Sequence, residues 1–251
     1  MLETRGLSVR FGGHVAVDAV NCAFAPGSLT AIVGPNGAGK TTYFNLISGQ
    51  LKATSGEVLL NGRSLAGLSP SARTRAGLGR AFQLTNLFPN LSVLENVRLA
   101  VQATQAGPHR RGLNLWSIWR DHTALTERAE TILQEVAMAD QADQPVSSLP
   151  HGDQRKLEVA LLMALEPQVY MFDEPTAGMS ADEAPVISNL IRRLKATGRY
   201  TILLVEHKMD VVRELADRIV VLHNGQCVAD GLPQDVMASA IVQQAYLGKR
   251  A

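Results

Sequence analysis

The feature that most restricts the fold is a glycine-rich turn between a short apolar run and a helical pattern. The apolar run, Leu29–Val33, predicts a buried strand. The turn after it has the spacing Gly34-x-x-x-x-Gly39-Lys40-Thr41, which is the spacing of a phosphate-binding loop. Glycine lets the backbone take positive φ and approach a ligand closely, so that successive N–H groups form a nest for anions. The sequence therefore predicts a site for a nucleoside triphosphate.

The residue types in this loop have separate tasks. The helix that starts near Lys40 directs its positive dipole end at the loop. The Lys40 ammonium adds a full charge for the β- and γ-phosphates, and the Thr41 hydroxyl is placed to ligate Mg²⁺. The predicted nucleotide-binding residues of this stretch are Gly34, Pro35, Asn36, Gly37, Ala38, Gly39, Lys40, Thr41 and Thr42. The loop alone does not identify the reaction or the use of its energy.

Length and composition narrow the class of protein. A chain of 251 residues predicts one large domain, or one domain with an insert. The 24 Lys and Arg residues nearly cancel the 23 Asp and Glu residues, so no basic excess points to nucleic acid. The first residues show no secretory signal, and every apolar run is far shorter than the ~20 residues that span a bilayer. We therefore expect a soluble chain that acts at a membrane only by docking on another protein.

The chain has two cysteines, Cys22 and Cys227, far apart in the sequence. Two scattered cysteines are too few for a disulfide framework or a metal site, which agrees with a reducing cytoplasm. We expect both to be small buried hydrophobic side chains.

Apolar periodicity and turn residues predict the order of the elements. The predicted strands span 7–11, 15–24, 57–65, 168–172, 201–205 and a hairpin over 218–229, with helices between the later strands. A turn is predicted at Asn61-Gly62 within 57–65. This alternation implies a mainly parallel sheet. A helix is also expected after Ser92, which has Glu95 three residues on as a capping partner. Residues 101–145 predict a mostly helical insert, in which Trp116 and Trp119 share one face and serve either internal packing or a partner.

A second buried strand, 168–172, is expected next to the strand before the loop, and it ends in two carboxylates. An unpaired carboxylate at this position is costly to bury, and Mg²⁺ held jointly by Asp173 and Thr41 would offset that cost. Glu174 follows at once and points to the opposite side. There it is predicted to lie beside the γ-phosphate and to orient and deprotonate the attacking water.

A third stretch, Leu149-Pro150-His151-Gly152-Asp153-Gln154, precedes a helix. With the loop and the acidic strand, it makes nearly the whole chain resemble the ATP-binding-cassette (ABC) ATPases. The signature sequence of that family, LSGGQ, is matched here at Leu149, Gly152 and Gln154. The resemblance also assigns Gln83 and His207 to the catalytic positions of the family, and Phe11 to the aromatic position that stacks on adenine.

The resemblance implies a fold and a set of ligands. The fold is α/β: a P-loop NTPase (RecA-like) core with a mainly parallel sheet, an N-terminal antiparallel β subdomain and an inserted α-helical subdomain. Residues 1–251 would form one nucleotide-binding domain, with its core in 1–84 and 155–251 and its helical subdomain in 85–154. The ligands are ATP and Mg²⁺. The implied residues are Glu174, His207 and Gln83 for catalysis, Thr41, Gln83 and Asp173 for Mg²⁺, and Leu149, His151, Gly152 and Asp153 for the nucleotide held by a second subunit.

The signature departs from the family pattern at two positions. Pro150 replaces the serine that contacts the γ-phosphate across the dimer, and His151 replaces a glycine. Proline has neither a hydroxyl nor an N–H, whereas the helix N-terminus after Gly152 still offers amides and a dipole. We expect a weaker but working contact, helped by His151.

Finer features resemble the longer ATP-binding subunit of branched-chain (hydrophobic) amino acid importers. They are Arg10-Phe11-Gly12-Gly13, the long insert with two tryptophans, the run 152–158, Val205-Glu206-His207-Lys208-Met209 and the ending Ala245-Tyr246-Leu247-Gly248. This resemblance implies a location on the cytoplasmic face of the inner (plasma) membrane. The implied partners are a second ABC ATPase subunit, identical or different, two transmembrane permease subunits and a periplasmic or extracellular substrate-binding protein, without nucleic acid. Leu87, Phe88 and Val93 are then either contacts for a membrane subunit or core residues.

Other functions share parts of this pattern. Importers of urea and short amides and the cassette of the lipopolysaccharide exporter remain alternatives for the cargo. A soluble cassette protein acting on DNA or the ribosome is an alternative of another class. Such proteins usually carry a second cassette, a coiled coil, zinc cysteines or a basic arm, and none is visible here.

Overall fold

The computed structural model describes residues 1–81, 87–105, 122–179, 183–239 and 242. The chain divides into two compact units. Unit 1 comprises Met1–Arg80, Gln168–Pro175 and Ile191–Ala251, and unit 2 comprises Ala81–Pro167 and Thr176–Leu190. The division at residues 84 and 155 that the sequence predicts, within one nucleotide-binding domain, stays a prediction.

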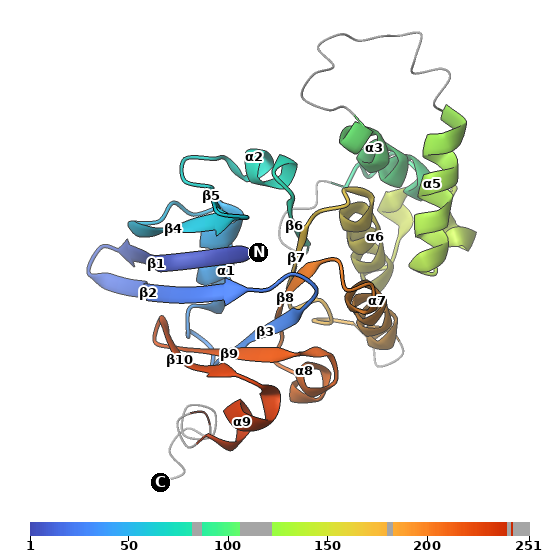
Figure 1. Cartoon of the computed structure of the whole chain (residues 1–251). Coiled ribbons are helices and arrows are strands. Elements are labelled where there is room, and N and C mark those ends of the chain that lie inside the picture. The colour runs from blue at the N-terminus through green and yellow to red at the C-terminus, as the bar shows by residue number, and fades with distance from the viewer. Residues whose placement is uncertain (82–86, 106–121, 180–182, 240–241, 243–251) are drawn as a thin grey trace. The chain divides into compact units, whose positions relative to one another are not determined.

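The N-terminal part of unit 1 is a four-stranded antiparallel sheet (Figure 1). Its strands are β1 (Leu2–Phe11), β2 (His14–Phe24), β4 (Ser55–Leu60) and β5 (Arg63–Ser64), in the order β2-β1-β4-β5. Asn61 and Gly62 between β4 and β5 both have positive φ, 51° and 77°, as a tight hairpin turn requires. The β subdomain and this turn are as the sequence predicts.

The second sheet of the chain has six strands in the order β10-β9-β3-β8-β7-β6. They are β3 (Leu29–Val33), β6 (Leu78–Ala81), β7 (Val169–Asp173), β8 (Thr201–Val205), β9 (Arg218–His223) and β10 (Gln226–Gly231). β3 pairs in parallel with β8 and β9, and β7 pairs in parallel with β8, whereas β9 and β10 are antiparallel. Every residue of β3, β7 and β8 is buried, since helices cover both faces of such a sheet.

The sheet order corrects one detail of the sequence prediction. The strand that ends in Asp173 was expected next to the strand before the glycine-rich loop, but β8 lies between β7 and β3. Pairing of all three strands in parallel still brings their carboxyl ends to one edge, and ligands of open parallel sheets bind at that edge.

One hydrophobic core fixes the helix that follows the loop. Helix α1 (Lys40–Ser48) buries Tyr43 and Phe44 completely, and both belong to a cluster that includes Phe24 of the antiparallel sheet and Met171 of the parallel sheet. The other helices of unit 1 are α2 (Pro70–Arg75), α8 (Met209–Leu215) and α9 (Pro233–Ala238), and α7 (Ala184–Ala196) runs from unit 2 into unit 1. The N-terminus of α1 is therefore held by packing on both sheets.

Unit 2 consists of helices that pack on one another. Its main helices are α3 (Val93–Gln105), α5 (His122–Glu135) and α6 (His151–Ala164), with short 3₁₀ turns at Ala139–Gln141 and Val146–Ser148. The capping box at the start of α3 is confirmed: Ser92 N donates to Glu95 Oε2 at 3.0 Å, and Glu95 N donates to Ser92 Oγ at 3.1 Å. Trp116 and Trp119 lie outside the described residues.

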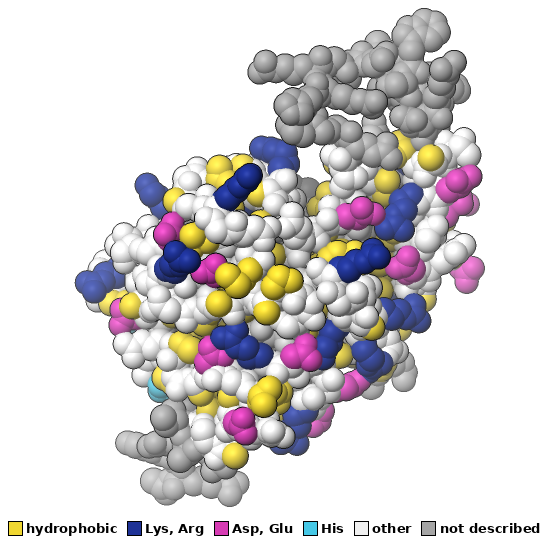
Figure 2. Space-filling model, viewed as in Figure 1, with side chains coloured by type: hydrophobic (Ala, Val, Ile, Leu, Met, Phe, Trp, Pro, Cys, Tyr) yellow, Lys and Arg dark blue, Asp and Glu magenta, His cyan; other side chains and the backbone are white. Residues whose placement is uncertain are grey.

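The surface carries charges of both signs. On the face in Figure 2, Lys and Arg side chains are interspersed with Asp and Glu side chains among the described residues. Within the described ranges, none of the helices combines the length and the apolar character that crossing a membrane requires.

Candidate functional site

A cavity of about 390 Å³ lies at the N-terminus of α1, within unit 1. It brings together most of the predicted loop with two predicted residues from far along the chain. The residues that line it are His14, Ala16, Asn36, Gly37, Ala38, Gly39, Lys40, Thr41, Thr42, Glu174 and His207. Gly34 and Pro35 belong to the same loop and contribute backbone carbonyls to it.

Two glycines of the loop are required by close contacts as well as by φ. Gly34 has φ 155°, and a Cβ there would lie 2.1 Å from the carbonyl oxygen of Leu222. Gly39 has φ 97°, and a Cβ there would lie 2.5 Å from the carbonyl oxygen of Ala16. Any larger residue at either position would push the loop off β2 or β9, so the loop conformation depends on these two glycines.

Lys40 is buried at the centre of the loop. Its ammonium donates to the carbonyl oxygens of Gly34 at 2.8 Å and Pro35 at 3.0 Å. Burial lowers the pKa of Lys40, and the carboxylates of Glu174 and Asp173 oppose that shift. The side chain thus already points along the loop, and an ammonium has a third N–H donor beyond these two bonds.

The N-terminus of α1 suits an anion. Its N-cap is Gly39, which has no side chain to accept a hydrogen bond from the first turn. The loop before it is held by backbone bonds: Ala38 N donates to Pro35 O at 3.1 Å, and Gly225 N donates to Ala38 O at 3.0 Å. The amides at this end therefore form a fixed donor group with the positive end of a helix dipole.

Glu174 and His207 form a pair at the cavity. His207 Nε2 lies 2.5 Å from Glu174 Oε1, and both side chains are about 40% exposed, at 41% and 38% respectively. Glu174 has φ 52°, a left-handed conformation that costs about 1–3 kcal/mol for a non-glycine residue and that clusters at functional sites. Glu206 Oε1 accepts from the amides of His207 and Lys208, which fixes the start of the segment that carries the imidazole.

Asp173 has a partner that the sequence analysis missed. Its Oδ2 accepts from Arg80 at 2.7 Å, and both side chains are only 6% exposed. Arg80 also donates to Asn45 Oδ1, Ser48 Oγ and Gln50 Oε1, and it lies 5.5 Å from the centre of the Phe44 ring. An arginine of unit 1 therefore offsets part of the cost of burying this carboxylate, and the predicted contact of Asp173 with Mg²⁺ stays a prediction.

Burial also lowers the pKa of Arg80, and its hydrogen bond with Asp173 opposes that shift. No local pattern could reveal this pair, since 93 positions separate its two residues.

The predicted signature residues lie together in unit 2, at the start of α6. The helix begins at His151 after Pro150, which gives no side-chain cap. Leu149 and Gly152 are buried and His151 is exposed. A Cβ on Gly152 would lie 2.2 Å from Glu183 Oε1, so a larger residue there would require the Glu183 side chain to move.

Asp153 is engaged inside unit 2. Lys156 Nζ donates to its Oδ1 at 2.8 Å, and Gln141 Nε2 donates to its Oδ2 at 2.9 Å. Burial on its own raises the pKa of Asp153, but the bonds from Lys156 and Gln141 outweigh it and leave the pKa below its usual value. Both oxygens of this carboxylate thus hold the helix start in place.

The remaining predicted residues have different outcomes. Phe11 is 50% exposed at the end of β1, so it is not a core residue. Gln83 lies outside the described residues. His14 and Ala16 of β2 line the cavity although the sequence analysis did not select them. His14 pairs with Phe11 across the hairpin, and this register was the signal that could have found it.

A strand, a glycine-rich loop and a helix N-terminus form a phosphate cradle at the carboxyl edge of a mainly parallel sheet. Lys40 and the Glu174–His207 pair stand beside it. This combination defines a P-loop nucleotide-binding protein.

Comparison with known proteins gives the family. A family model described as "ABC transporter" matches residues 17–177. The chain is 38% identical over 250 residues to the high-affinity branched-chain amino acid transport ATP-binding protein LivG of Escherichia coli K12, covering 99% of this chain and 98% of that one. The chain therefore belongs to the ABC transporter family, and it is an ATPase of that family.

Solved structures agree with this assignment. The ADP conformation of an ATP-binding cassette of an ABC transporter superposes with a TM-score of 0.81 at 29% identity, covering 99% of both chains. A dimeric cassette in a post-hydrolysis state, bound to ADP and Pi, superposes with a TM-score of 0.77 at 25% identity, covering 93% of this chain and 99% of that one. The predicted fold class and the predicted nucleotide, ATP, are confirmed.

Proposed function

We propose that the chain is the ATP-hydrolysing motor subunit of an importer for branched-chain or other hydrophobic amino acids. The similarity to LivG supports this proposal because it extends over nearly the full length of both chains. The residues that contact the transported molecule lie in other polypeptides of such an importer, so the residues of the ATPase do not identify that molecule.

The observation that carries the ATPase mechanism is the contact between Glu174 and His207 at the cavity that holds Lys40. Glu174 is the general base: its carboxylate orients the attacking water and accepts its proton. His207 donates a hydrogen bond to the γ-phosphate and keeps the Glu174 side chain aimed at the cavity. Lys40 and the amides at the start of α1 hold the β- and γ-phosphates.

Mg²⁺ belongs to this proposal as well. Thr41 is exposed and lines the cavity, so its hydroxyl offers an oxygen ligand, and Asp173 and Gln83 would supply the other protein oxygens. Hydroxyl, carboxylate and amide oxygens suit Mg²⁺, which binds few protein ligands and keeps several waters. Asp173 accepts from Arg80 through Oδ2, and a carboxylate has further lone pairs that an ion can use. When bound, the ion neutralises phosphate charge that develops during hydrolysis.

A second cassette completes the site in this proposal. The phosphate loop is in unit 1 and the signature residues 149–153 are in unit 2, and the dimeric cassette bound to ADP and Pi is a precedent. Leu149 is buried and Asp153 is bonded within unit 2. The groups that would contact the nucleotide of the partner subunit are therefore exposed His151 and the first amides of α6.

The signature contact has its own test. We expect ATPase activity of the dimer to rise in Pro150→Ser and to fall in His151→Ala. If both variants match the natural chain, the signature contact does not depend on this pair.

The proposed partners are the second ATPase subunit, two transmembrane permease subunits and an external substrate-binding protein. The chain would then lie on the cytoplasmic face of the membrane. Phe88 is 53% exposed and is the strongest of the three predicted membrane-subunit contacts. Leu87 is half-buried, and Val93 is fully buried and belongs to the core of unit 2.

The cargo is tested with the whole complex. Gentle membrane extraction through a tag on this chain, followed by identification of the bound subunits, separates a transporter from a cassette protein of DNA or the ribosome. A screen of the associated binding protein with leucine, isoleucine and valine against urea and short amides then identifies the cargo. Tight binding of urea or an amide, with no amino acid bound, would overturn the amino acid proposal and leave the ATPase assignment intact.

A further inference from the structure

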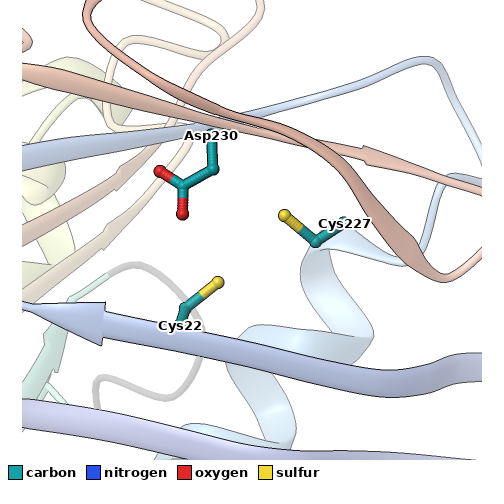
Figure 3. A group of neighbouring side chains, drawn as sticks. All are labelled: Cys22, Cys227 and Asp230. Carbon is teal, nitrogen blue, oxygen red and sulfur yellow. The ribbon is translucent and has the colours of Figure 1, made fainter.

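The two cysteines of the chain, which the sequence analysis treated as scattered, meet in the structure. Cys22 lies on β2 and Cys227 on β10, and Asp230 of β10 joins them. The sulfur atoms and a carboxylate oxygen all lie within 4.8 Å of one another. Figure 3 shows the three side chains pointing toward one another. Cys22 is buried as expected, but Cys227 is only half-buried and Asp230 is exposed, so the group opens to solvent.

A β-bulge creates this group. In a regular strand, residues three apart point to opposite faces, which would separate Cys227 from Asp230. The register between β10 and β9 shifts between Cys227 and Ala229, so that Val228 is the extra residue. The bulge brings Cys227 and Asp230 to the same face, where Cys22 of β2 meets them. Bulges recur where a strand must redirect a side chain toward a site.

We propose that Cys22, Cys227 and Asp230 bind a thiol-preferring divalent metal ion of the Zn²⁺ class, at a site separate from the nucleotide cavity. Two cysteine sulfurs and one carboxylate oxygen are ordinary zinc ligands, and water fills the fourth position of a tetrahedron. A tetrahedral zinc site separates two sulfurs by about 3.8 Å, so small side-chain rotations within the observed 4.8 Å suffice.

The charges around the group balance once the ion is bound. Binding replaces the two thiol protons, which are released to solvent, so the ion and its three protein ligands carry one net negative charge. Arg218 of β9 forms an ion pair with Asp230 and also donates to the carbonyl oxygen of Ala23 next to Cys22. Its positive charge neutralises the metal site. A carboxylate offers about four lone-pair positions, so Asp230 can keep Arg218 and still ligate the ion.

The site would brace the contact that supports the phosphate loop. Asp18 N of β2 donates to Gly225 O at 2.9 Å, and Gly225 N donates to Ala38 O of the loop at 3.0 Å. A metal bridge from Cys22 to Cys227 fastens β2 to β10 close to this chain of bonds. Because the ion binds the folded state, it raises the midpoint of thermal unfolding.

The test uses the reduced full chain without nucleotide, freed of metal by a chelator and titrated with Zn²⁺ against a colorimetric competitor. We expect one ion per chain, loss of this binding in Cys22→Ser and Cys227→Ser, and about tenfold or greater weakening in Asp230→Asn. Asp235→Asn, at an exposed acid of α9, is the matched control and should bind as the natural chain does. Co²⁺ in place of Zn²⁺ should give sulfur-to-metal charge-transfer absorption that the cysteine variants lack.

Two further measurements keep the proposal open to refutation. Cys22→Ala is included in case serine unfolds β2, with circular dichroism as the check of folding. Equal Zn²⁺ affinity in the natural chain and a folded double cysteine variant would overturn the proposal. So would the absence of stoichiometric binding together with loss of both free thiols under mild peroxide, because that result would assign the pair to disulfide formation instead.

Discussion

The buried ion pair between Arg80 and Asp173 gives the sharpest stability prediction. Both side chains are 6% exposed. Arg80 also donates hydrogen bonds to the side chains of Asn45 and Ser48 in α1 and of Gln50 after it. Arg80→Met keeps much of the volume but leaves the Asp173 carboxylate buried without its cation. Removing one member of a buried pair costs about 3–5 kcal/mol. We therefore expect the free energy of unfolding to fall by about 4 kcal/mol.

A second variant separates charge from packing. In Arg80→Met with Asp173→Asn, the buried negative charge is gone, so the double variant should be at least about 1 kcal/mol more stable than Arg80→Met alone. The exposed pair of Arg128 and Glu166, with side chains 43% and 59% exposed, is the control. Arg128→Met should cost about 0–1 kcal/mol.

The measurement is chemical denaturation of the nucleotide-free chain followed by circular dichroism. A loss below about 1 kcal/mol in Arg80→Met would refute the claim that this arginine compensates the buried carboxylate. A double variant less stable than the single variant would refute it as well, since the removal of Asp173 would then bring no relief.

The remaining predictions concern the nucleotide site. Lys40→Ala should abolish ATP binding in a fluorescent-nucleotide titration, because among the described loop residues that line the cavity only Lys40 carries a full positive charge for the phosphates. Retained tight binding would falsify the phosphate-loop assignment. Glu174→Gln should bind ATP, accumulate a dimer on size exclusion and lose turnover; activity within tenfold of the natural chain, a barrier change of ~1.4 kcal/mol, would place the base elsewhere. Phe11→Ala should weaken ATP binding by about 1–3 kcal/mol, the worth of one aromatic stack, and an unchanged Kd would remove Phe11 from the site. Gly39→Ala should lower the free energy of unfolding by about 3 kcal/mol or more, because Gly39 has φ 97° and its Cβ would lie 2.5 Å from a backbone oxygen. Gly13→Ala, which has open space around it, should cost under about 0.5 kcal/mol. Equal losses of the two variants in a denaturation series would contradict the close-contact explanation.

Local chemistry determined what the sequence alone could establish. The phosphate loop, the capping box of Ser92 and Glu95 and the Asn61-Gly62 turn each occupy a few consecutive residues, because backbone φ and hydrogen bonds to nearby amides are set by neighbours in the chain. Apolar runs such as Leu29–Val33 predicted buried strands for the same reason. These features predicted a site for a nucleoside triphosphate in an α/β chain, and the resemblance to the ABC ATPases added the detailed fold class and ATP.

The tertiary structure alone decided which distant residues meet. It placed β8 between β3 and β7, set Arg80 against Asp173, brought His14 to the cavity and put Glu174 beside His207. Such partners depend on strand order and register, which the spacing of residues along one segment does not encode.

The cysteines show the same limit most directly. Their sequence separation indicated two unrelated hydrophobic side chains, yet the contact of β2 with β10 and one extra residue at Val228 bring both thiols to Asp230. A bulge changes the side-chain alternation of a strand without leaving a signal in the pattern of residue types. Sequence therefore specified the phosphate cradle, and three-dimensional packing specified what surrounds it.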